Sequence, residues 1–244
     1  MGKISKFITI AVIATFFSGS AMAFKGLSFG IMGTAADFET TGKEIEGYGV
    51  GGVQVIDTSA TTTIGKSVQF PSVFLEWSGG EANSIGYTVG LEYVPGTASL
   101  GSKIRTDTAS VSGAETNTET NKDNNTYTAK ARVSNYATFY VEPTYMYGEN
   151  VGLYLKGAVS RLTIETLEDL ASGTDSSTYG DEDILGASYG IGVKAVTPIG
   201  IFFKIEATKS VFQSVKLTST TGNKNQIEAT PEATNFRLGM GFNF

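Results

Sequence analysis

The residue types that most often do chemistry in proteins are scarce in this sequence. It has no His and no Cys among its 244 residues, which removes Ser-His and Cys-His nucleophile systems and leaves no disulfide framework. One acidic stretch offers carboxylates that calcium accepts, but it lacks the Asp-x-Asp-x-Asp-Gly order of a dedicated loop. It comprises Glu168, Asp169, Asp175 and residues 181–183. We therefore expect no catalytic residue, no metal site and no cofactor, and we expect the chain not to be an enzyme.

Eight charged residues alternate with apolar neighbours. In each case every second residue nearby is apolar, so in a β-strand the charge falls on the opposite face. The signs balance, four against four: Glu76, Glu92, Glu142 and Glu206 against Lys156, Lys194, Lys204 and Arg237. A lipid-facing Arg or Lys at the bilayer midplane costs about 2–4 kcal/mol, so this segregation predicts a paired charge network inside a membrane barrel. Solvated residues on a water-soluble sheet are the alternative interpretation.

The last eight residues alternate strictly and finish on an aromatic side chain. One face carries Leu238, Met240, Phe242 and Phe244, and the other carries Arg237, Gly239, Gly241 and Asn243. This pattern suits a strand with lipid on one side and a wet lumen on the other. Closure of a barrel would place this strand beside the first and the seventh, so we expect Glu206 to be the partner of Arg237.

Seven further segments alternate in the same way. The eight segments cover residues 27–34, 72–77, 85–93, 137–147, 153–159, 185–193, 203–207 and 237–244. Long and short connections between these segments alternate along the chain. The long ones are mostly polar (36–66, 95–128, 166–183, 211–231), and the short ones are rich in turn formers (78–84, 148–150, 197–200). The strands of outer-membrane barrels are connected in this alternating way.

The pattern predicts an all-β fold, a transmembrane antiparallel up-and-down β-barrel of eight strands. Ten strands are the alternative, because residues 50–56 and 214–219 could supply two more strands or extend hairpins above the membrane. Aromatic residues near the predicted strand ends suit interfacial girdles, although core packing uses the same residue types. They are Trp77, Tyr93, Tyr145 and Tyr147.

The N-terminus has the features of a secretory signal. Lys3 and Lys6 precede an apolar run, 7–17, that is too short to span a bilayer comfortably, and small residues stand at Ala21 and Ala23. We expect cleavage of residues 1–23, which leaves 24–244 as one barrel domain; an uncleaved anchor helix is the alternative. Cleavage would shift the formal charge from −6 to −8, since both lysines are lost and no acidic residue precedes residue 24. An acidic chain argues against a nucleic-acid partner.

The terminal residues Arg237, Gly239, Phe242 and Phe244 resemble the signal by which bacterial outer-membrane proteins reach the barrel-assembly machinery. With the signal peptide, strand count and loop alternation, the chain resembles small outer-membrane barrels of the OmpA membrane-domain and OmpX type. The resemblance implies a monomeric protein of the bacterial outer membrane, in contact with lipid and lipopolysaccharide, and important for envelope integrity or surface contact. We expect no peptidoglycan-binding domain of the kind that full OmpA proteins carry after the barrel, so the resemblance does not imply anchoring to the cell wall.

Three classes of function remain open from the sequence. The first is a non-catalytic barrel whose lumen is filled by side chains and whose loops meet the surroundings. The second is a small porin-like channel for ions or small solutes, which a larger strand number would favour. The third is a soluble secreted β-sandwich adhesin.

Overall fold

The chain folds into one antiparallel sheet in a computed structural model that describes residues 25–47, 56–58, 61–106, 126–170, 179–218, 220 and 226–244. Its strands are β1 (Gly26–Gly47), β2 (Ile56–Thr58), β3 (Thr62–Gly79), β4 (Ile85–Tyr93), β5 (Ala98–Thr106), β6 (Thr126–Tyr147), β7 (Val151–Leu170), β8 (Glu182–Val196), β9 (Ile201–Phe212), β10 (Val215–Thr218) and β11 (Gln226–Asn243). No helix among the described residues is long and apolar enough to cross a membrane. The predicted signal peptide, 1–23, lies outside the described residues.

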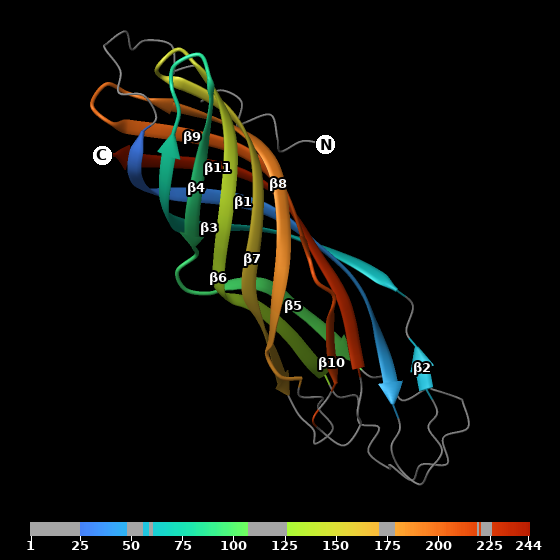
Figure 1. The fold of residues 1–244 in the computed structure, drawn as a ribbon. Coiled ribbons are helices and arrows are strands. Elements are labelled where there is room, and N and C mark those ends of the chain that lie inside the picture. Colours follow the sequence, from blue (N-terminus) through green and yellow to red (C-terminus); the bar gives the residue numbers. More distant parts are fainter. Residues whose placement is uncertain are drawn as a thin grey trace, which may run out of the picture.

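Eight of these strands close into a ring, in the order β1, β3, β4, β6, β7, β8, β9 and β11 (Figure 1). The last strand returns to the first over a continuous antiparallel register that runs from Ser28–Asn243 to Ile45–Gln226. The ring confirms the predicted eight-stranded up-and-down barrel. It shows that the β-sandwich alternative is wrong, because a sandwich has two separate sheets.

Three strands, β2, β5 and β10, do not belong to the ring. Among the described residues β2 pairs only with the end of β1, β10 only with the start of β11, and β5 only with the start of β6. Of the two ranges that could have supplied ring strands, residues 50–55 and 219 lie outside the described residues. The described strand residues in them, Ile56 and 215–218, extend hairpins beyond the eight-stranded ring.

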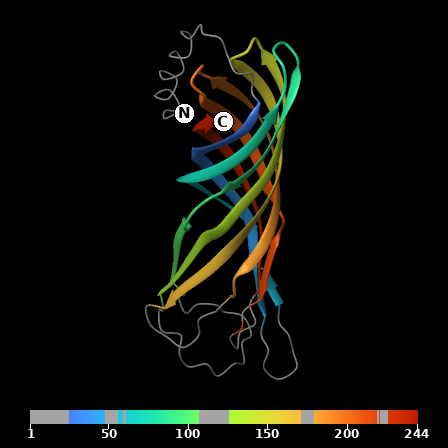
Figure 2. The same cartoon turned by 60° about the vertical axis from the view of Figure 1, so that its left-hand side comes forward.

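The barrel has two unlike ends. The three short turns, at residues 80–84, 148–150 and 197–200, lie at one end together with the C-terminus, and we call this the turn end (Figure 1). The other end carries β2, β10 and the end of β5, and we call it the loop end (Figure 2). The three predicted short connections are confirmed.

The strands extend much further toward the loop end than the alternation predicted. β1 continues to Gly47 and β7 to Leu170, while β3 begins at Thr62, β6 at Thr126 and β11 at Gln226. Large parts of the predicted loops 36–66, 95–128, 166–183 and 211–231 are thus strand. Beyond lipid a strand needs no apolar outer face, and these extensions are rich in Thr, which favours extended backbone.

Large inward side chains are accommodated over glycines of neighbouring strands. A Cβ built on Gly90 would lie 2.3 Å from the ring of Tyr140, and one on Gly192 would lie 2.3 Å from the ring of Tyr154. Each tyrosine ring therefore occupies the volume that a side chain on the next strand would need. These pairs explain how a narrow eight-stranded lumen holds several aromatic residues.

Candidate functional site

The outer face of the barrel carries an uncharged belt at the turn end. Its outward residues alternate with buried ones along every ring strand and include Ile31, Leu75, Leu91, Phe139, Leu155, Ile191, Phe203 and Leu238, all of them exposed. In described residues 27–35, 71–77, 85–93, 137–147, 151–159, 185–195, 201–207 and 234–244, no outward position carries a charge. Soluble proteins seldom expose a continuous apolar surface of this extent. The surface is that of a barrel that spans a membrane.

Outward charges begin directly above this belt, toward the loop end. Arg161 Nη2 lies 2.6 Å from Asp183 Oδ2, and Lys209 Nζ lies 2.9 Å from Glu232 Oε2. Further toward the loop end, Lys216 and Lys43 flank Glu228 and hold the pKa of its carboxyl below the ordinary value, mainly through hydrogen bonds. These pairs mark the level at which the outer surface becomes polar.

The eight charged residues singled out from the sequence all lie inside the barrel and are buried. They come from seven of the eight ring strands: Glu76 from β3, Glu92 from β4, Glu142 from β6, Lys156 from β7, Lys194 from β8, Lys204 and Glu206 from β9, and Arg237 from β11. The remaining strand, β1, contributes Thr34, whose hydroxyl accepts a hydrogen bond from Arg237 Nε at 3.2 Å.

Lys204 lies at the centre of the ion pairs on the turn-end side. Its Nζ is 3.0 Å from Glu76 Oε2, 2.9 Å from Glu142 Oε2 and 3.5 Å from Glu206 Oε1. Glu76 also accepts a hydrogen bond from Lys194. Lys204 has no exposed side-chain surface, so its charge is compensated inside the lumen, chiefly by these carboxylates.

The same pattern continues toward the loop end. Lys156 Nζ lies 3.2 Å from Glu142 Oε1 and 3.1 Å from Glu206 Oε2. Arg237 Nη1 donates to Glu206 Oε2 at 2.8 Å, and its Nη2 donates to Glu92. The eight residues therefore form one chain of alternating sign across the lumen, which we call the lumen network, in the order Lys194, Glu76, Lys204, Glu142, Lys156, Glu206, Arg237, Glu92.

Two tyrosines that were not predicted from the sequence belong to the lumen network. Tyr140 donates to Glu76 Oε2 and Tyr154 donates to Glu206 Oε1, both at 2.9 Å. Lys156 Nζ also lies 4.0 Å from the centre of the Tyr140 ring. The available signal was position: each tyrosine is two residues from an inward charge, Glu142 or Lys156, and so shares its face of the strand.

Apolar side chains pack the lumen on both sides of the network. Toward the turn end, Met32, Phe74, Met146, Val196 and Phe202 form a buried cluster. Toward the loop end a larger cluster includes Phe38, Val133, Leu162, Ile184, Phe212 and Leu217. The charges of the lumen network therefore lie between two apolar clusters in the described part of the barrel.

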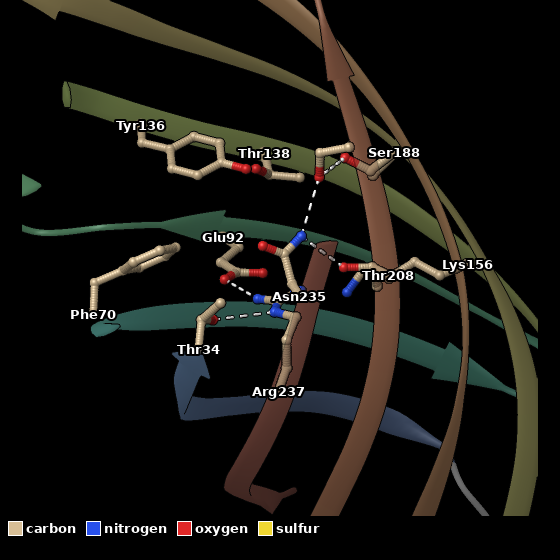
Figure 3. A pocket seen from close by; sticks show the side chains of 12 residues that line it. Thr34, Phe70, Glu92, Tyr136, Thr138, Lys156, Ser188, Thr208, Asn235 and Arg237 are labelled. Carbon is tan, nitrogen blue, oxygen red and sulfur yellow. Dashed lines mark hydrogen bonds and ion pairs between the residues drawn. The ribbon is translucent and has the colours of Figure 1, made fainter. Parts of the chain in front are cut away.

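A small polar cavity separates the network from the loop-end cluster. It has a volume of about 30 Å³, which is room for about two water molecules. Figure 3 shows Arg237 pointing toward Glu92 and Thr34 at one side, while Asn235 Nδ2 donates to Thr208 Oγ1 at 3.0 Å. The cavity is far too small for a drug-sized molecule, because binding pockets for such ligands have volumes of about 300 Å³ or more.

A β-bulge in β6 lies next to Tyr136, which lines this cavity. The register with β7 shifts between Ser134 and Ala137, and Asn135 has a left-handed backbone with φ of 51°. Tyr136 faces inward like Thr138 and Tyr140, and its ring lies 6.3 Å from Phe70 and 6.4 Å from Phe212. Before the bulge the odd-numbered Val133 is the buried residue, a change of face that sequence alternation could not reveal, because a bulge breaks its period of two.

The four residues of the predicted assembly signal divide between the two faces of β11. Arg237 belongs to the lumen network, and a Cβ on Gly239 would lie 2.8 Å from Met32 inside the barrel. Phe242 and Phe244 point outward, and their rings are 5.1 Å apart. The N–H of Phe244 donates to the carbonyl of Leu27 at 2.9 Å, so the last residue completes the ladder between β11 and β1.

The predicted girdle aromatics and the acidic stretch lie outside the lumen network. Trp77, Tyr93, Tyr145 and Tyr147 are outward and exposed, and the Trp77 ring lies edge-on to Tyr87 at 5.5 Å. Among the described residues no group of three or more carboxylates is arranged to hold a metal. Of the acidic stretch, Asp183 is bonded to Arg161 and Thr163, and Asp175 lies outside the described residues.

Comparison with known proteins gives a likeness of fold. No protein-family model matches the sequence, and no curated protein matches it significantly. Solved structures that resemble it include Ail of Yersinia pestis, crystallised with the heparin analogue sucrose octasulfate (13% identity, 87% of this chain and 99% of that chain, TM-score 0.31). The outer membrane protease OmpT of Escherichia coli (14%, 93% and 99%, 0.36) and the outer membrane protein OprG of Pseudomonas aeruginosa (11%, 91% and 98%, 0.34) are also similar. At such identities and TM-scores the likeness carries no information about activity or ligands.

Proposed function

We propose that this chain is a non-catalytic, integral protein of the bacterial outer membrane, monomeric, with a closed lumen and with extended strands that contact the surroundings of the cell. The observation that carries the proposal is the pairing of an uncharged outer belt with eight buried charges in the lumen. In water the belt would be a large unfavourable surface, whereas in lipid it is matched by the acyl chains.

The contacts within the lumen network support the proposal that the protein is not an enzyme. Its carboxylates are already engaged by lysine, arginine or tyrosine, and the neighbouring cavity of about 30 Å³ has no room for a substrate. A catalytic acid or base has to reach the reacting atom, either directly or through one water. The lack of His and Cys in the sequence points the same way.

The outward ion pairs support contact with lipid headgroups. Arg161–Asp183 and Lys209–Glu232 lie directly above the belt, where a bilayer changes from acyl chains to charged headgroups. In the outer leaflet of an outer membrane those headgroups belong to lipopolysaccharide. The proposal therefore includes lipid and lipopolysaccharide as its surroundings and the barrel-assembly machinery as a partner during biogenesis.

Cell fractionation followed by a carbonate wash tests the membrane assignment. We expect the protein to stay with the outer-membrane fraction, because carbonate removes peripheral proteins and leaves integral ones. Protease treatment of whole cells should cut the loop-end strands and leave a protected fragment. Recovery of the intact protein in the soluble fraction would contradict the proposal.

Planar-bilayer recording tests the closed lumen. The barrel refolded from residues 24–244 should show no large, stable conductance, because apolar clusters block the lumen on both sides of the network. Porin-like steps from the purified protein would instead support the channel alternative.

A further inference from the structure

Two residues of the lumen network, Lys156 and Glu206, are held close enough to react with each other. Lys156 Nζ lies 3.1 Å from each oxygen of the Glu206 carboxylate, so the nitrogen faces the carboxyl group symmetrically, opposite its carbon. Both side chains are buried, and both come from strands of the closed ring, β7 and β9. Groups that a rigid fold keeps at about 3–3.5 Å have a large entropic advantage over the same groups free in solution.

Hydrogen-bond donors other than Lys156 hold both oxygens of the Glu206 carboxylate. Tyr154 donates to Oε1 at 2.9 Å, and Arg237 Nη1 donates to Oε2 at 2.8 Å. Lys204 Nζ lies 3.5 Å from Oε1 as well. When a nucleophile adds to a carboxyl carbon, negative charge develops on these oxygens, and fixed donors in a dry site stabilise it. Glu206 is therefore surrounded by the groups that such an addition needs.

A second carboxylate is placed to accept protons from the same lysine. Glu142 Oε1 lies 3.2 Å from Lys156 Nζ. The ammonium has to lose a proton before its nitrogen can attack, and a base within hydrogen-bond reach, either directly or through one water, can take that proton. Lysine amines serve as covalent nucleophiles in proteins when a neighbouring group deprotonates them. Lys156, Glu206 and Glu142 thus supply a nucleophile, an electrophile and a base.

The small polar cavity distinguishes Lys156 from the other lysines of the lumen network. Lys156 lines this cavity, and in the described lumen Lys194 and Lys204 do not. Figure 3 shows Lys156 beside Thr208 at the cavity, whose volume is about 30 Å³, room for about two water molecules. Condensation of an ammonium with a carboxylate releases one water. The cavity gives that water a polar place directly beside the reacting atoms.

We propose that Lys156 and Glu206 condense to an amide that links β7 to β9 inside the barrel. Glu142 takes one proton from Lys156 Nζ, the nitrogen lone pair forms a bond to the Glu206 carboxyl carbon, and one C–O electron pair moves onto the oxygen held by Tyr154. The other oxygen receives the proton from Glu142 and a second proton from the nitrogen. Its bond to carbon then breaks, and it leaves as water. One ammonium and one carboxylate become one amide and one water, so no further reactant is needed.

The reaction removes two charges from surroundings in which charge is costly. In a buried ion pair the loss of hydration offsets most of the attraction, whereas an amide is uncharged. Its N–H can donate to Glu142 and its carbonyl can accept from Tyr154, so neither group loses its hydrogen bond. The lumen network stays balanced, with three cations, Lys194, Lys204 and Arg237, and three carboxylates, Glu76, Glu92 and Glu142. The step occurs once in each chain, so it does not make the protein an enzyme.

The amide joins two strands that are not neighbours in the ring, since β8 lies between β7 and β9. Lys156 and Glu206 are 50 positions apart in sequence, so the bond closes a long loop. A covalent link of this kind restricts the unfolded chain in the same way as a disulfide, and this sequence has no Cys with which to form one. The bond therefore stabilises the closed barrel against unfolding.

Mass spectrometry of the parent barrel isolated from cells is the direct test. The denatured chain should be lighter by one water molecule than its sequence requires. Trypsin does not cleave after an acylated lysine, so digestion should leave a branched peptide that joins the segments around Lys156 and Glu206. The matched control is Lys156→Arg, which keeps the positive charge but does not form this amide, and it should have the full mass.

The rate of the reaction tests the role of Glu142. A chain refolded from urea into detergent micelles begins with the ion pair, and the loss of water should then develop with time. Glu142→Gln lacks the proton acceptor and should react about a hundredfold more slowly or less, whereas Glu232→Gln, on the outer face, should react at the parent rate.

Three results would overturn the proposal. They are a full mass for the parent both from cells and after prolonged refolding, a loss of water that maps to other residues, and equal rates for Glu142→Gln and Glu232→Gln. The first two are measured on the parent chain, so they do not depend on the folding of any variant. The mass is also independent of cellular location, so failure of the membrane assignment would be seen separately, in fractionation.

Discussion

Replacement of Lys204 by methionine is the most direct perturbation of the lumen network. The substitution keeps the length and apolar stem of the side chain but removes a positive charge that lies within 3.5 Å of Glu76, Glu142 and Glu206. The lumen would then hold four carboxylates against three cations. Removing one partner of a buried ion pair leaves an uncompensated charge and typically costs about 3–5 kcal/mol.

Urea unfolding of the barrel in phosphatidylcholine vesicles measures this cost. The chain has a single tryptophan, Trp77, which lies outward and 51% exposed on the belt, so its fluorescence reports loss of the lipid environment. For an m-value of about 2 kcal/mol/M, a loss of about 4 kcal/mol lowers the urea midpoint by about 2 M. The matched control is Lys216→Met, whose ion pair with Glu228 is exposed and contributes about 0–1 kcal/mol.

A double variant separates charge imbalance from loss of packing. Adding Glu142→Gln to Lys204→Met restores equal numbers of buried cations and anions, three of each, and should recover part of the lost stability. If Lys204→Met and Lys216→Met had the same urea midpoint, the network would contribute nothing to stability. If the double variant were less stable than the single one by the full cost of a second broken pair, the argument from charge balance would be wrong.

Three other results are expected. Gly192→Ala should destabilise the barrel by about 1–3 kcal/mol, because the new Cβ would lie 2.3 Å from the buried ring of Tyr154. The control Gly157→Ala should be tolerated, because the nearest atom to its new Cβ is 3.8 Å away. Equal urea midpoints for the two variants would contradict the packing argument. Deletion of Phe244 should reduce the amount of protein in the outer membrane of cells far more than it reduces refolding into micelles. The effect on refolding should be small, because Phe244 contributes one ladder hydrogen bond and ring contacts on the outer face. Normal levels in cells would show that Phe244 has no role in assembly. Mass spectrometry of the protein isolated from cells should find Phe24 as the first residue, and a chain that still begins at Met1 would refute cleavage.

The strand number and the facing of each ring strand followed from the sequence. Alternation of apolar and polar residues has a period of two, which depends only on a residue's neighbours along the chain. It assigned Leu75 and Leu238 to the outer face and Glu76 and Arg237 to the opposite one, and the structure has them so. Turn formers at 148–150 and 197–200 likewise mark the ends of strands through local backbone preferences.

The extent of the strands was not determined in this way. Outside the belt β1 continues through residues 36–47, where polar residues such as Thr40 and Thr41 face no lipid and the alternation fades. These residues are strand because β11 and β3 supply ladder partners for them. A hydrogen-bonded partner far away in sequence leaves no signature in a local pattern.

Only the tertiary structure decided which charges meet. Glu142 lies between Lys156 and Lys204, and Arg237 joins Glu92 to Glu206, although these residues are up to 145 positions apart in sequence. Which inward residues come to the same level depends on the stagger of all eight strands around the ring. A bulge such as the one between Ser134 and Ala137 changes that level locally. The sequence determined the face of each charge because lipid excludes charge at every strand separately, whereas the pairing inside depends on closure of the whole barrel.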